Sequence, residues 1–444
     1  MKKRIFLLCL LLNFSISSSA QCWNSVAVGY NNIFAIAENG TLWAWGKNSF
    51  GELGDGTNTL KNSPVQIGTS NNWKEVSPSM DGIYSFTLAL KTDGTLWTWG
   101  SNNKGQLGDN TTINRNYPLQ IGTDTDWKTV AAGLSHSIAI KENGTLWGWG
   151  TPERYALSVP YASSFVVEPR QIGTDSNWKQ ASAHDRVTVA VKTDNTVWGW
   201  GWNRNDMLNA PSGATIAGDV YYPVQKIVGT NVKETRTGDR ISIDIKTNNN
   251  ISQLGTTAYY VKDVDTGVST TAYIRFDNNT LWYSGKMLGS TNQNIQGMTQ
   301  LSSATNWESI SVGSQCAAAI NSVGEIYTWG SNSQGALGIG VNGTTTSSTV
   351  PVLVPCPSIL LNTTPFETYI GLKLFPNPVQ NTLNLESNKT IERLVIYDVM
   401  GKKCFDQSFD TSKVSVNCSQ FSQGLYIIQA YSGQSKIQTK FIKE

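Results

Sequence analysis

Few residues in this chain have the type and spacing that catalysis needs. The sequence contains only two histidines, His136 and His184. His136 lies nine residues after Trp127 and His184 lies six residues after Trp178, so the two occupy different positions of a recurring pattern. No His, Cys and Asp residues have the spacing of a metal site. A structural role is therefore favoured for both histidines over a role in a site.

Other chemical motifs are also missing. The sequence contains no Gly-x-Ser-x-Gly nucleophile elbow and no phosphate-binding loop. A recurring Gly-Gln-Leu-Gly lacks the lysine and the spacing of such a loop, and we interpret it as a turn. Asp55 and Asp109 follow this turn. They could pair or bind calcium, but an Asp after Gly more often caps a local turn. We therefore expect the protein to have no catalytic residues, to bind no cofactor or metal, and not to be an enzyme.

The tryptophans are the remaining candidates, because a Trp-rich exported protein suggests stacking on carbohydrate. Trp202 stands out of register beside Arg204, and these two are the candidate exposed binding residues. A contact in a small satellite core is the alternative for Trp202. The other fifteen of the 16 fall at three recurring positions, which favours core filling: Trp23, Trp73, Trp127, Trp178 and Trp307; Trp43, Trp97, Trp147, Trp198 and Trp282; Trp45, Trp99, Trp149, Trp200 and Trp329.

These positions belong to a repeat whose best copy is Lys91–Gly100. Its Asp-Gly pair suits a tight type I′ hairpin turn, and the following Thr-Leu-Trp-Thr-Trp favours a strand. A Trp-x-x-Val-x-x-Gly element precedes the stretch, and Gly-x-Leu-Gly follows it. Each unit predicts about four short strands, as in one propeller blade. The other six copies are Ala37–Gly46, Lys141–Gly150, Lys192–Gly201, Lys246–Gly255, Phe276–Gly285 and Asn321–Gly330.

The stretch Trp99–Gly108 resembles the signature of the regulator of chromosome condensation repeat. The resemblance covers roughly residues 22–355 and implies an all-β, seven-bladed β-propeller, which we place at residues 21–355. Copy six begins only six residues after Gly255, so copy five should lack its outer strand. Copies three and four lose the Gly-x-Leu-Gly turn. The blades between residues 200 and 300 should therefore be the least regular.

The N-terminus predicts export. A basic start, the apolar run Ile5–Leu12 and small residues up to Ala20 form a secretory signal peptide, residues 1–20. The apolar run is too short for a transmembrane segment. Among the 444 residues only 15% are charged, the net charge is +2 and no basic stripe occurs, so no nucleic acid partner is expected.

Five cysteines remain after signal removal, and an exported chain permits disulfides. Cys22 begins the first blade and Cys356 follows the last, and a closed ring would bring them together. Cys404 and Cys418 lie 14 residues apart in one small domain and form the second candidate pair. Cys316 sits at a core-like position, where a buried thiol is expected.

Residues 356–371 read as a linker, after which the tryptophans end. Residues 372–444 resemble the C-terminal sorting domain of the type IX secretion system. Alternating strands split by turn residues predict a small, Ig-like β-sandwich. The resemblance implies passage through the periplasm of a Gram-negative cell to its outer surface by the type IX machinery. The motif residues are Pro376, Asn377, Pro378, Gly401, Lys402, Gly424, Tyr426, Lys440 and Phe441.

Two functions remain open at this point. The favoured one is a secreted or cell-surface binding protein that presents loops on a rigid ring to an extracellular protein or glycan. The alternative is an extracellular carbohydrate-binding protein or hydrolase built on a propeller. Convergent acid–base or metal residues in several blades would favour the alternative, and the sequence shows none.

Overall fold

The computed structural model describes most of the chain and divides it into two compact units, Met1–Leu361 and Asn362–Glu444. The predicted signal peptide, nearly all of the predicted linker and Gly401 lie outside the described residues. The described ranges are 22–158, 164–210, 215–216, 218–226, 231–238, 241–252, 260–286, 288, 294–340, 347–357, 372–398, 402–432 and 435–444.

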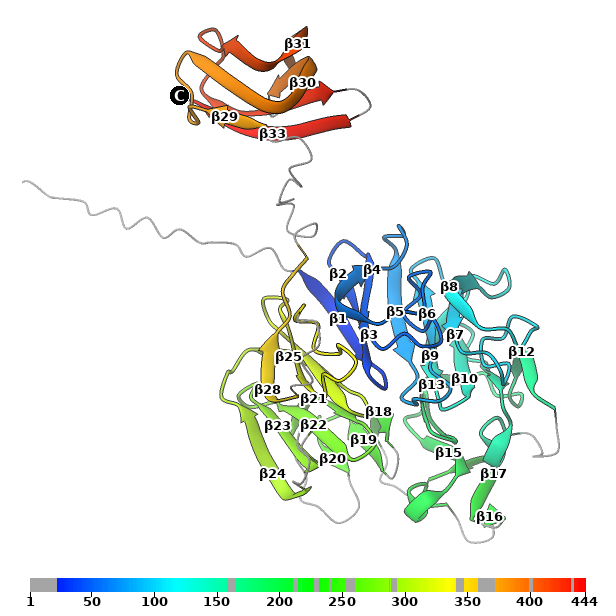
Figure 1. The fold of residues 1–444 in the computed structure, drawn as a ribbon. Helices are drawn as coiled ribbons and strands as arrows, with labels where there is room; N and C mark the ends of the chain where they lie inside the picture. The colour runs from blue at the N-terminus through cyan, green and yellow to red at the C-terminus, as the bar shows by residue number, and fades with distance from the viewer. Residues whose placement is uncertain are drawn as a thin grey trace, which may run out of the picture. The chain divides into compact units, whose positions relative to one another are not determined.

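The first unit is a ring of seven antiparallel sheets, as the sequence predicted (Figure 1). Five sheets contain four strands in chain order, and one of these five is blade six, described below. The first two are β1 (Trp23–Val28), β2 (Asn32–Ala37), β3 (Leu42–Gly46), β4 (Lys61–Gln66), and β5 (Trp73–Pro78), β6 (Phe86–Lys91), β7 (Leu96–Gly100), β8 (Arg115–Gln120). The third is β9 (Trp127–Ala132), β10 (His136–Lys141), β11 (Leu146–Gly150), β12 (Val166–Gln171), and the seventh is β25 (Trp307–Val312), β26 (Cys316–Asn321), β27 (Ile326–Gly330), β28 (Ser348–Leu353).

The remaining three blades carry the predicted irregularities. Blade four adds a short strand, blade five has three strands among its described residues, and blade six has a long outer strand. Blade four comprises β13 (Trp178–His184), β14 (Val187–Lys192), β15 (Val197–Trp202), β16 (Thr215–Ile216) and β17 (Asp219–Gln225). Blades five and six comprise β18 (Val232–Thr237), β19 (Ser242–Lys246), β20 (Ile251–Ser252), and β21 (Val261–Thr266), β22 (Thr270–Arg275), β23 (Leu281–Lys286), β24 (Asn294–Ser302).

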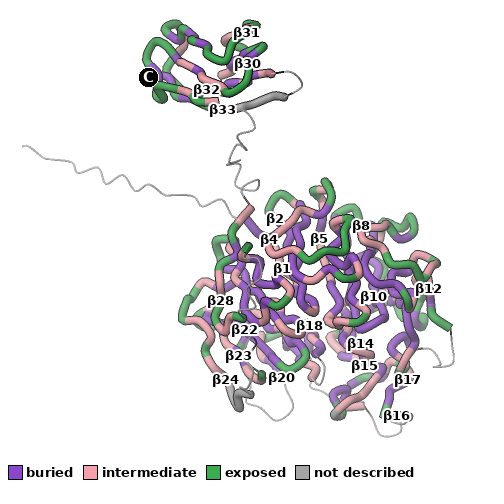
Figure 2. Tube along the Cα trace, viewed as in Figure 1, coloured by how far each residue is buried: buried purple, intermediate pink, exposed green. Residues whose placement is uncertain are grey.

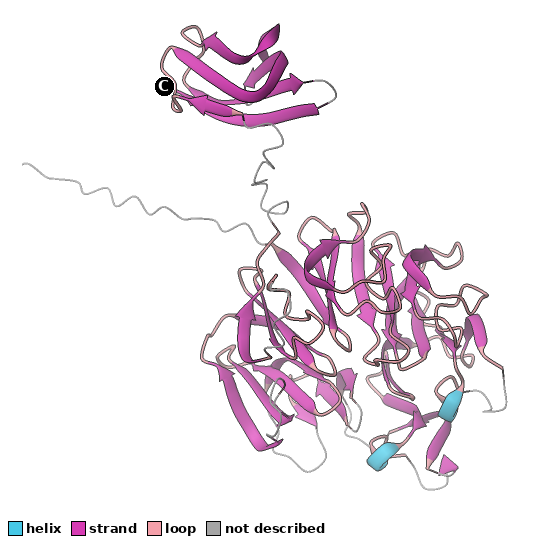
Figure 3. Ribbon diagram, in the orientation of Figure 1, coloured by secondary structure: helices cyan, strands magenta, loops and turns pink. Residues whose placement is uncertain are grey.

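Where blades three and four lack Gly-x-Leu-Gly, short 3-10 helices make the turn instead. These are η1 (Glu153–Tyr155) and η2 (Arg204–Asp206), the two helical turns among the described residues (Figure 3). Elsewhere the glycine is required. Gly108 has a φ of 73°, and a Cβ there would lie 2.8 Å from the indole ring of Trp149 in the next blade. The turn glycine therefore seats the neighbouring tryptophan.

The three tryptophans of one blade pack on each other and on the preceding blade. Trp73 meets Trp97 and Trp99 edge to face, with centroids 5.9 Å apart in both pairs. Trp99 is fully buried, and its Nε1 donates a hydrogen bond to the carbonyl of Glu52 in the turn of blade one. Buried residues accordingly fill the sheets, and exposed ones gather at turns and outer edges (Figure 2). Core filling explains these columns.

The ring closes between its first and last blades. The innermost strands β1 and β25 lie side by side, and Trp45 Nε1 donates to the carbonyl of Ala336 in blade seven. Among the described residues, every blade uses a contiguous stretch of chain, and no strand is exchanged between the first and last blades. The predicted disulfide between Cys22 and Cys356 is present and joins residues 334 positions apart. Cys316 is fully buried, and burial raises the pKa of its thiol to about 12.

The second unit is a five-stranded curled sheet, in line with the predicted all-β, Ig-like fold. Residues Thr382–Asp398 form one long strand, whose pairing register shifts between Glu386 and Ile391. The apolar core of the sheet includes Leu383, Leu394 and Phe441. The strands are β29 (Lys373–Phe375), β30 (Thr382–Asp398), β31 (Lys403–Asn417), β32 (Gly424–Ser432) and β33 (Ser435–Lys443).

The predicted bond between Cys404 and Cys418 is wrong. Both thiols are free, and they lie at opposite ends of β31, which has 15 residues. A strand rises about 3.3 Å per residue, whereas a disulfide needs Cα atoms within about 7 Å. Each sulfur instead contacts a nearby carbonyl, that of Lys402 for Cys404 and that of Val416 for Cys418.

We expect the double variant Cys22→Ser/Cys356→Ser to unfold more easily. The chain-entropy description gives about 6 kcal/mol for a loop this long, although disulfides stabilise proteins by at most about 5 kcal/mol in practice. Chemical denaturation of the exported protein measures the loss, and Cys404→Ser serves as a control that should change stability by less than about 0.5 kcal/mol. Equal stabilities of the double variant and the parent would contradict the clasp.

Candidate functional site

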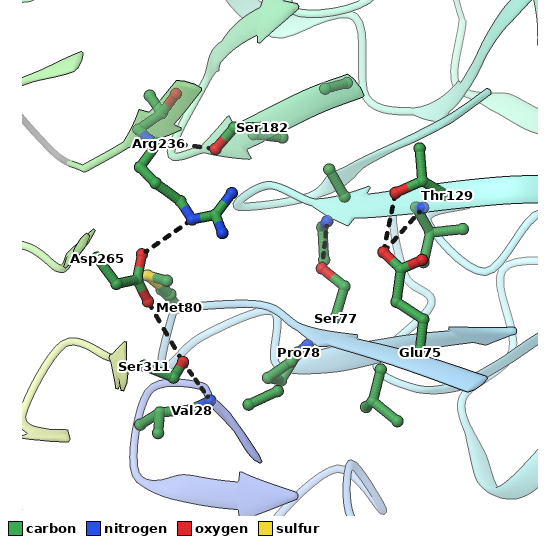
Figure 4. A pocket seen from close by; sticks show the side chains of 18 of the residues that line it. Val28, Glu75, Ser77, Pro78, Met80, Thr129, Ser182, Arg236, Asp265 and Ser311 are labelled. Atoms are coloured by element: carbon green, nitrogen blue, oxygen red, sulfur yellow. Dashed lines mark hydrogen bonds and ion pairs between the residues drawn. The ribbon is translucent and has the colours of Figure 1, made fainter. Parts of the chain in front are cut away.

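The innermost strands of all seven blades surround a cavity of about 320 Å³ on the ring axis (Figure 4). In each innermost strand, the side chains of the second and fourth residues after the first residue of the strand lie on the same face, which is turned toward the axis. The first residue is a column tryptophan in five blades, and it is Val232 in blade five and Val261 in blade six. At the second position lie Ser25, Glu75, Thr129, Gln180, Glu234, Asp263 and Ser309, and at the fourth lie Ala27, Ser77, Ala131, Ser182, Arg236, Asp265 and Ser311.

Hydrogen bonds to side chains of these two columns connect blade two to three, four to five, six to seven and seven to one. Ser77 Oγ accepts a hydrogen bond from the amide of Ala132 at 3.0 Å, and Ser182 Oγ accepts one from Thr237 at 3.1 Å. Ser311 Oγ accepts one from Val28 at 3.1 Å, which spans the closure. We call these contacts the axial stitches. The remaining ones run from Val130 to Glu75, Thr235 to Gln180, Ile310 to Asp263 and Val312 to Asp265.

The stitches explain two exceptions in the columns. Blade one has Ala27 where an acceptor is expected, and the facing residue in blade two is Pro78, which has no amide hydrogen to donate. Blade five has Arg236, the one cation among the cavity-lining residues. Arg236 forms an ion pair with Glu234 and lies 4.0 Å from Asp265. An arginine therefore replaces an acceptor on the axis of blade five.

Burial shifts the pKa values of the axial carboxyls. Desolvation raises the pKa of Asp265 to about 6, although Arg236 and the amides of Val312 and Thr266 oppose this shift. Desolvation also raises the pKa of Glu75, against hydrogen bonds from Thr129 and Val130. Both carboxyl groups accept hydrogen bonds from backbone amides of the next blade. Among the described residues, no group of three His, Cys, Asp or Glu side chains could hold a metal ion.

The two histidines lie on neighbouring blades: His136 begins β10 of blade three, and His184 ends β13 of blade four. His136 is fully buried, and its Nε2 lies 3.1 Å from Thr188 Oγ1 in blade four. Desolvation lowers the pKa of His136 to about 3, with smaller effects from Arg186 and His184. His184 lines a second cavity, of about 220 Å³, together with Tyr30, Met80 and Asp185. Met80 lines both cavities.

Trp202 and Arg204 lie at the end of β15 and the start of η2, and both are half-buried. The guanidinium of Arg204 lies 4.2 Å from the centroid of the Trp202 ring. Arg154 of blade three and Arg186 lie 5.4 and 5.7 Å from it. Arg186 also bonds Glu153 in blade three at 3.0 Å. This group is neither a lone exposed aromatic nor a satellite core, but a cluster of cations around one indole.

Two similar clusters precede it in the chain. Lys47 lies 5.6 Å from the ring of Tyr30 and 5.0 Å from that of Phe50. Lys104 lies 5.8 Å from the ring of Tyr84 and 4.9 Å from that of Phe165 in blade three. All three groups sit on loops that follow the first or third strand of a blade, hence on one face of the ring. We call this face the loop face and the groups the cation–aromatic clusters.

Sequence reasoning missed the stitches and the first two clusters, although it singled out Trp202 and Arg204 of the third. A usable signal for the stitches was present, because five of the seven residues at the fourth position after the column tryptophan are Ser, Asp or Arg. The clusters carry no such period, since loops of different length supply them. Asp55 and Asp109 were interpreted correctly, because each accepts a hydrogen bond from the amide two residues later.

Comparison with known proteins identifies a repeat and a C-terminal domain in this chain. Residues 39–78, 93–140 and 323–361 match the Regulator of chromosome condensation (RCC1) repeat. A second description of that repeat matches residues 23–52 and 127–154. Residues 373–444 match the Secretion system C-terminal sorting domain. The chain therefore carries these repeats and ends in a domain that directs export by type IX secretion to the cell surface or the medium.

Similar proteins share parts of the chain. The Ultraviolet-B receptor UVR8 of Arabidopsis thaliana is 33% identical over 22% of this chain and 22% of its own length. The RCC1 domain-containing protein RUG3, mitochondrial, of the same plant is 30% identical over 38% of each chain. This chain thus spans well under half of these relatives. Among the described residues, no helix has the length and apolar composition needed to cross a membrane.

Solved structures with a related fold include yeast RCC1 bound to Kap60, at 18% identity and a TM-score of 0.47. The match covers 75% of this chain and 75% of that one. Human WBSCR16 is 19% identical with a TM-score of 0.46, over 76% of this chain and 82% of that chain.

Removing one stitch should weaken the ring measurably. Ser77→Ala leaves the buried amide of Ala132 without its acceptor, so the free energy of unfolding should fall by about 1–2 kcal/mol. Ala27→Ser is the matched control, because Pro78 offers no donor, and it should change stability by less than about 0.5 kcal/mol. Denaturant titration compares the variants, and equal losses in both would refute the stitch.

Acid should destabilise the protein through His136. In the unfolded chain its pKa is 6.5 and in the fold about 3, so its contribution is complete above pH 6.5 and is lost as the pH falls toward 3. Between pH 7 and 5 the loss is about 2 kcal/mol. Asp265 acts in the opposite direction, because its folded pKa is raised.

The parent and His136→Gln must therefore be compared at both pH values. Glutamine keeps a polar group near Thr188 but does not titrate. The difference in unfolding free energy between the two proteins should change by about 2 kcal/mol from pH 7 to 5. A difference that stays constant with pH would show that His136 keeps its ordinary pKa.

Proposed function

We propose that this exported repeat protein is a non-enzymatic binding protein that recognises an extracellular protein through its loop face. The observation that carries the proposal is the series of three cation–aromatic clusters on blades one to four. Tyr84, Lys104 and Phe165 connect blades two and three, and Arg154, Trp202 and Arg204 connect blades three and four. Trp, Tyr and Arg dominate the energetics of protein interfaces.

The geometry of the clusters favours a protein ligand over a glycan. A sugar stacks on an uncovered aromatic face, whereas here a cation lies over each ring, at 4.2 Å for Trp202 and 4.9 Å for Phe165. Such groups are also pre-organised, because acidic residues hold the cations: Asp219 bonds Arg154, and Glu153 bonds Arg186. A surface already held in place loses little side-chain entropy on binding.

A hydrolase is the less favoured candidate. Hydrolysis needs a free carboxylate or metal-bound water near substrate. In the axial cavity, Asp265 and Glu75 instead accept hydrogen bonds from backbone amides of the next blade.

We also propose a division of roles between the domains: residues 21–355 bind the ligand, and residues 372–444 serve export alone.

The test uses the exported protein and its variant Lys104→Glu/Arg204→Glu. Both are incubated with surface and secreted proteins of the producing bacterium, cross-linked, and the captured protein is identified and titrated. A partner should bind the variant at least about tenfold more weakly, as for interface hot spots. Arg170→Glu, on the outer strand β12 with its side chain 67% exposed, is the matched control and should bind normally.

A glycan array run in parallel separates the alternatives. Binding of a defined glycan that is lost in the same variant would replace the protein partner by a carbohydrate. Equal affinity of the parent and the Lys104→Glu/Arg204→Glu variant for the captured protein would contradict the proposed face.

A further inference from the structure

The axial cavity has the size and the chemistry of a small-molecule site. At about 320 Å³ it lies near the lower end of ligand pockets, which run from about 300 to 1,000 Å³. Its walls are strands of all seven blades rather than loops, so the space exists before any ligand arrives. Hydroxyl and amide groups line it, among them Thr129 and Gln180, and such a polar space excludes an apolar ligand.

The charged groups in the wall are not balanced. Glu75, Glu234 and Asp265 oppose Arg236 alone, which leaves two formal negative charges. Glu234 and Asp265 lie beside Arg236 and compensate its charge. Glu75 lies on a different blade and forms no ion pair among the described residues, although the charges of Lys74 and Arg236 act on it from a distance (Figure 4). The imbalance is therefore centred on Glu75.

Glu75 has one oxygen available. Its Oε1 accepts hydrogen bonds from Thr129 Oγ1 at 2.9 Å and from the amide of Val130 at 3.4 Å. Among the described residues, no donor is hydrogen-bonded to its second oxygen, Oε2. The side chain is only partly accessible, so bulk water compensates its charge poorly, and burial raises its pKa. A positively charged donor inside the cavity would satisfy both the charge and the open oxygen.

We propose that the axial cavity binds a small organic molecule through a protonated primary amine, with Glu75 as its counter-ion. An ammonium group offers three donors, which suit a carboxylate oxygen flanked by hydroxyl and carbonyl acceptors. An anion is disfavoured by the net charge of the wall. A metal ion is disfavoured because Glu75 stands apart from the other carboxylates and thus offers a single ligand.

The second cavity supplies an entrance from the loop face. Met80 lines both spaces, and the second one is also lined by Asp81, Tyr30 and Leu134. Asp185 lines it as well but is paired with Arg186, so the carboxylate that would attract a cation there is that of Asp81. The apolar groups would accept the methylene chain of an alkyl amine. The entrance shares Tyr30 with the proposed protein-binding face, but the variants that test the two proposals differ, because this one uses neither Lys104 nor Arg204.

Titration calorimetry of the exported protein with putrescine, a four-carbon diamine, tests the proposal. Butane-1,4-diol has the same length without charge, and succinate carries the opposite charge. Putrescine should bind at a single saturable site, and the other two should give no binding heat.

Two variants locate the site. Glu75→Gln keeps an acceptor for Thr129 and Val130 but removes the charge, and it should weaken putrescine binding at least about 30-fold. Met80→Trp narrows the passage without touching Glu75 and should also reduce binding. Glu38→Gln, on the exposed β2–β3 hairpin, is the control. Thermal melts verify folding of each variant.

Three results would overturn the proposal. One is the absence of binding heat with putrescine at millimolar concentration. Another is unchanged putrescine affinity in a folded Glu75→Gln protein, which would show general attraction to acidic surface. The third is equal binding of butane-1,4-diol, which would show that the amine is not recognised.

Discussion

A ring of blades is stable only if its last blade covers its first. Each sheet buries both faces against neighbours, so an open ring would expose two apolar faces to water. Trp45 of blade one packs against the turn of blade seven as Trp99 packs against blade one, and its indole donates to Ala336. The chain adds a covalent bond at this joint, between Cys22 and Cys356. Export to an oxidising compartment permits this solution.

The same repeat divides its residues between support and recognition. Positions near the axis connect blades through side chains that accept backbone amides, as Ser77 does for Ala132 and Ser311 for Val28. The loops do not form these axial hydrogen bonds, and they differ from blade to blade. Variation in these loops places Trp202 among three arginines and Lys104 between Tyr84 and Phe165. Rigid support and variable loops are the usual arrangement for binding.

The sequence predicted what depends on periodicity and missed what depends on distance. Seven copies predicted seven blades, and the deletion after Gly255 predicted the short fifth blade. Ring closure predicted the bond between Cys22 and Cys356. The spacing of Cys404 and Cys418 misled, because it does not reveal that one continuous strand separates them. The axial cavity could not be predicted, since seven strands far apart in the chain build it.

Hydrogen exchange of the exported protein tests most directly whether the ring is one closed, cooperative body. The amides of Val28, Ala132, Thr237 and Val312 all take part in axial stitches, and that of Val28 spans the closing joint. The account predicts that all four exchange at the same slow rate, set by global unfolding, while the loop amide of Ile83 exchanges far faster. Faster exchange at Val28 than at Ala132, Thr237 and Val312 would show an open joint and contradict the closed ring.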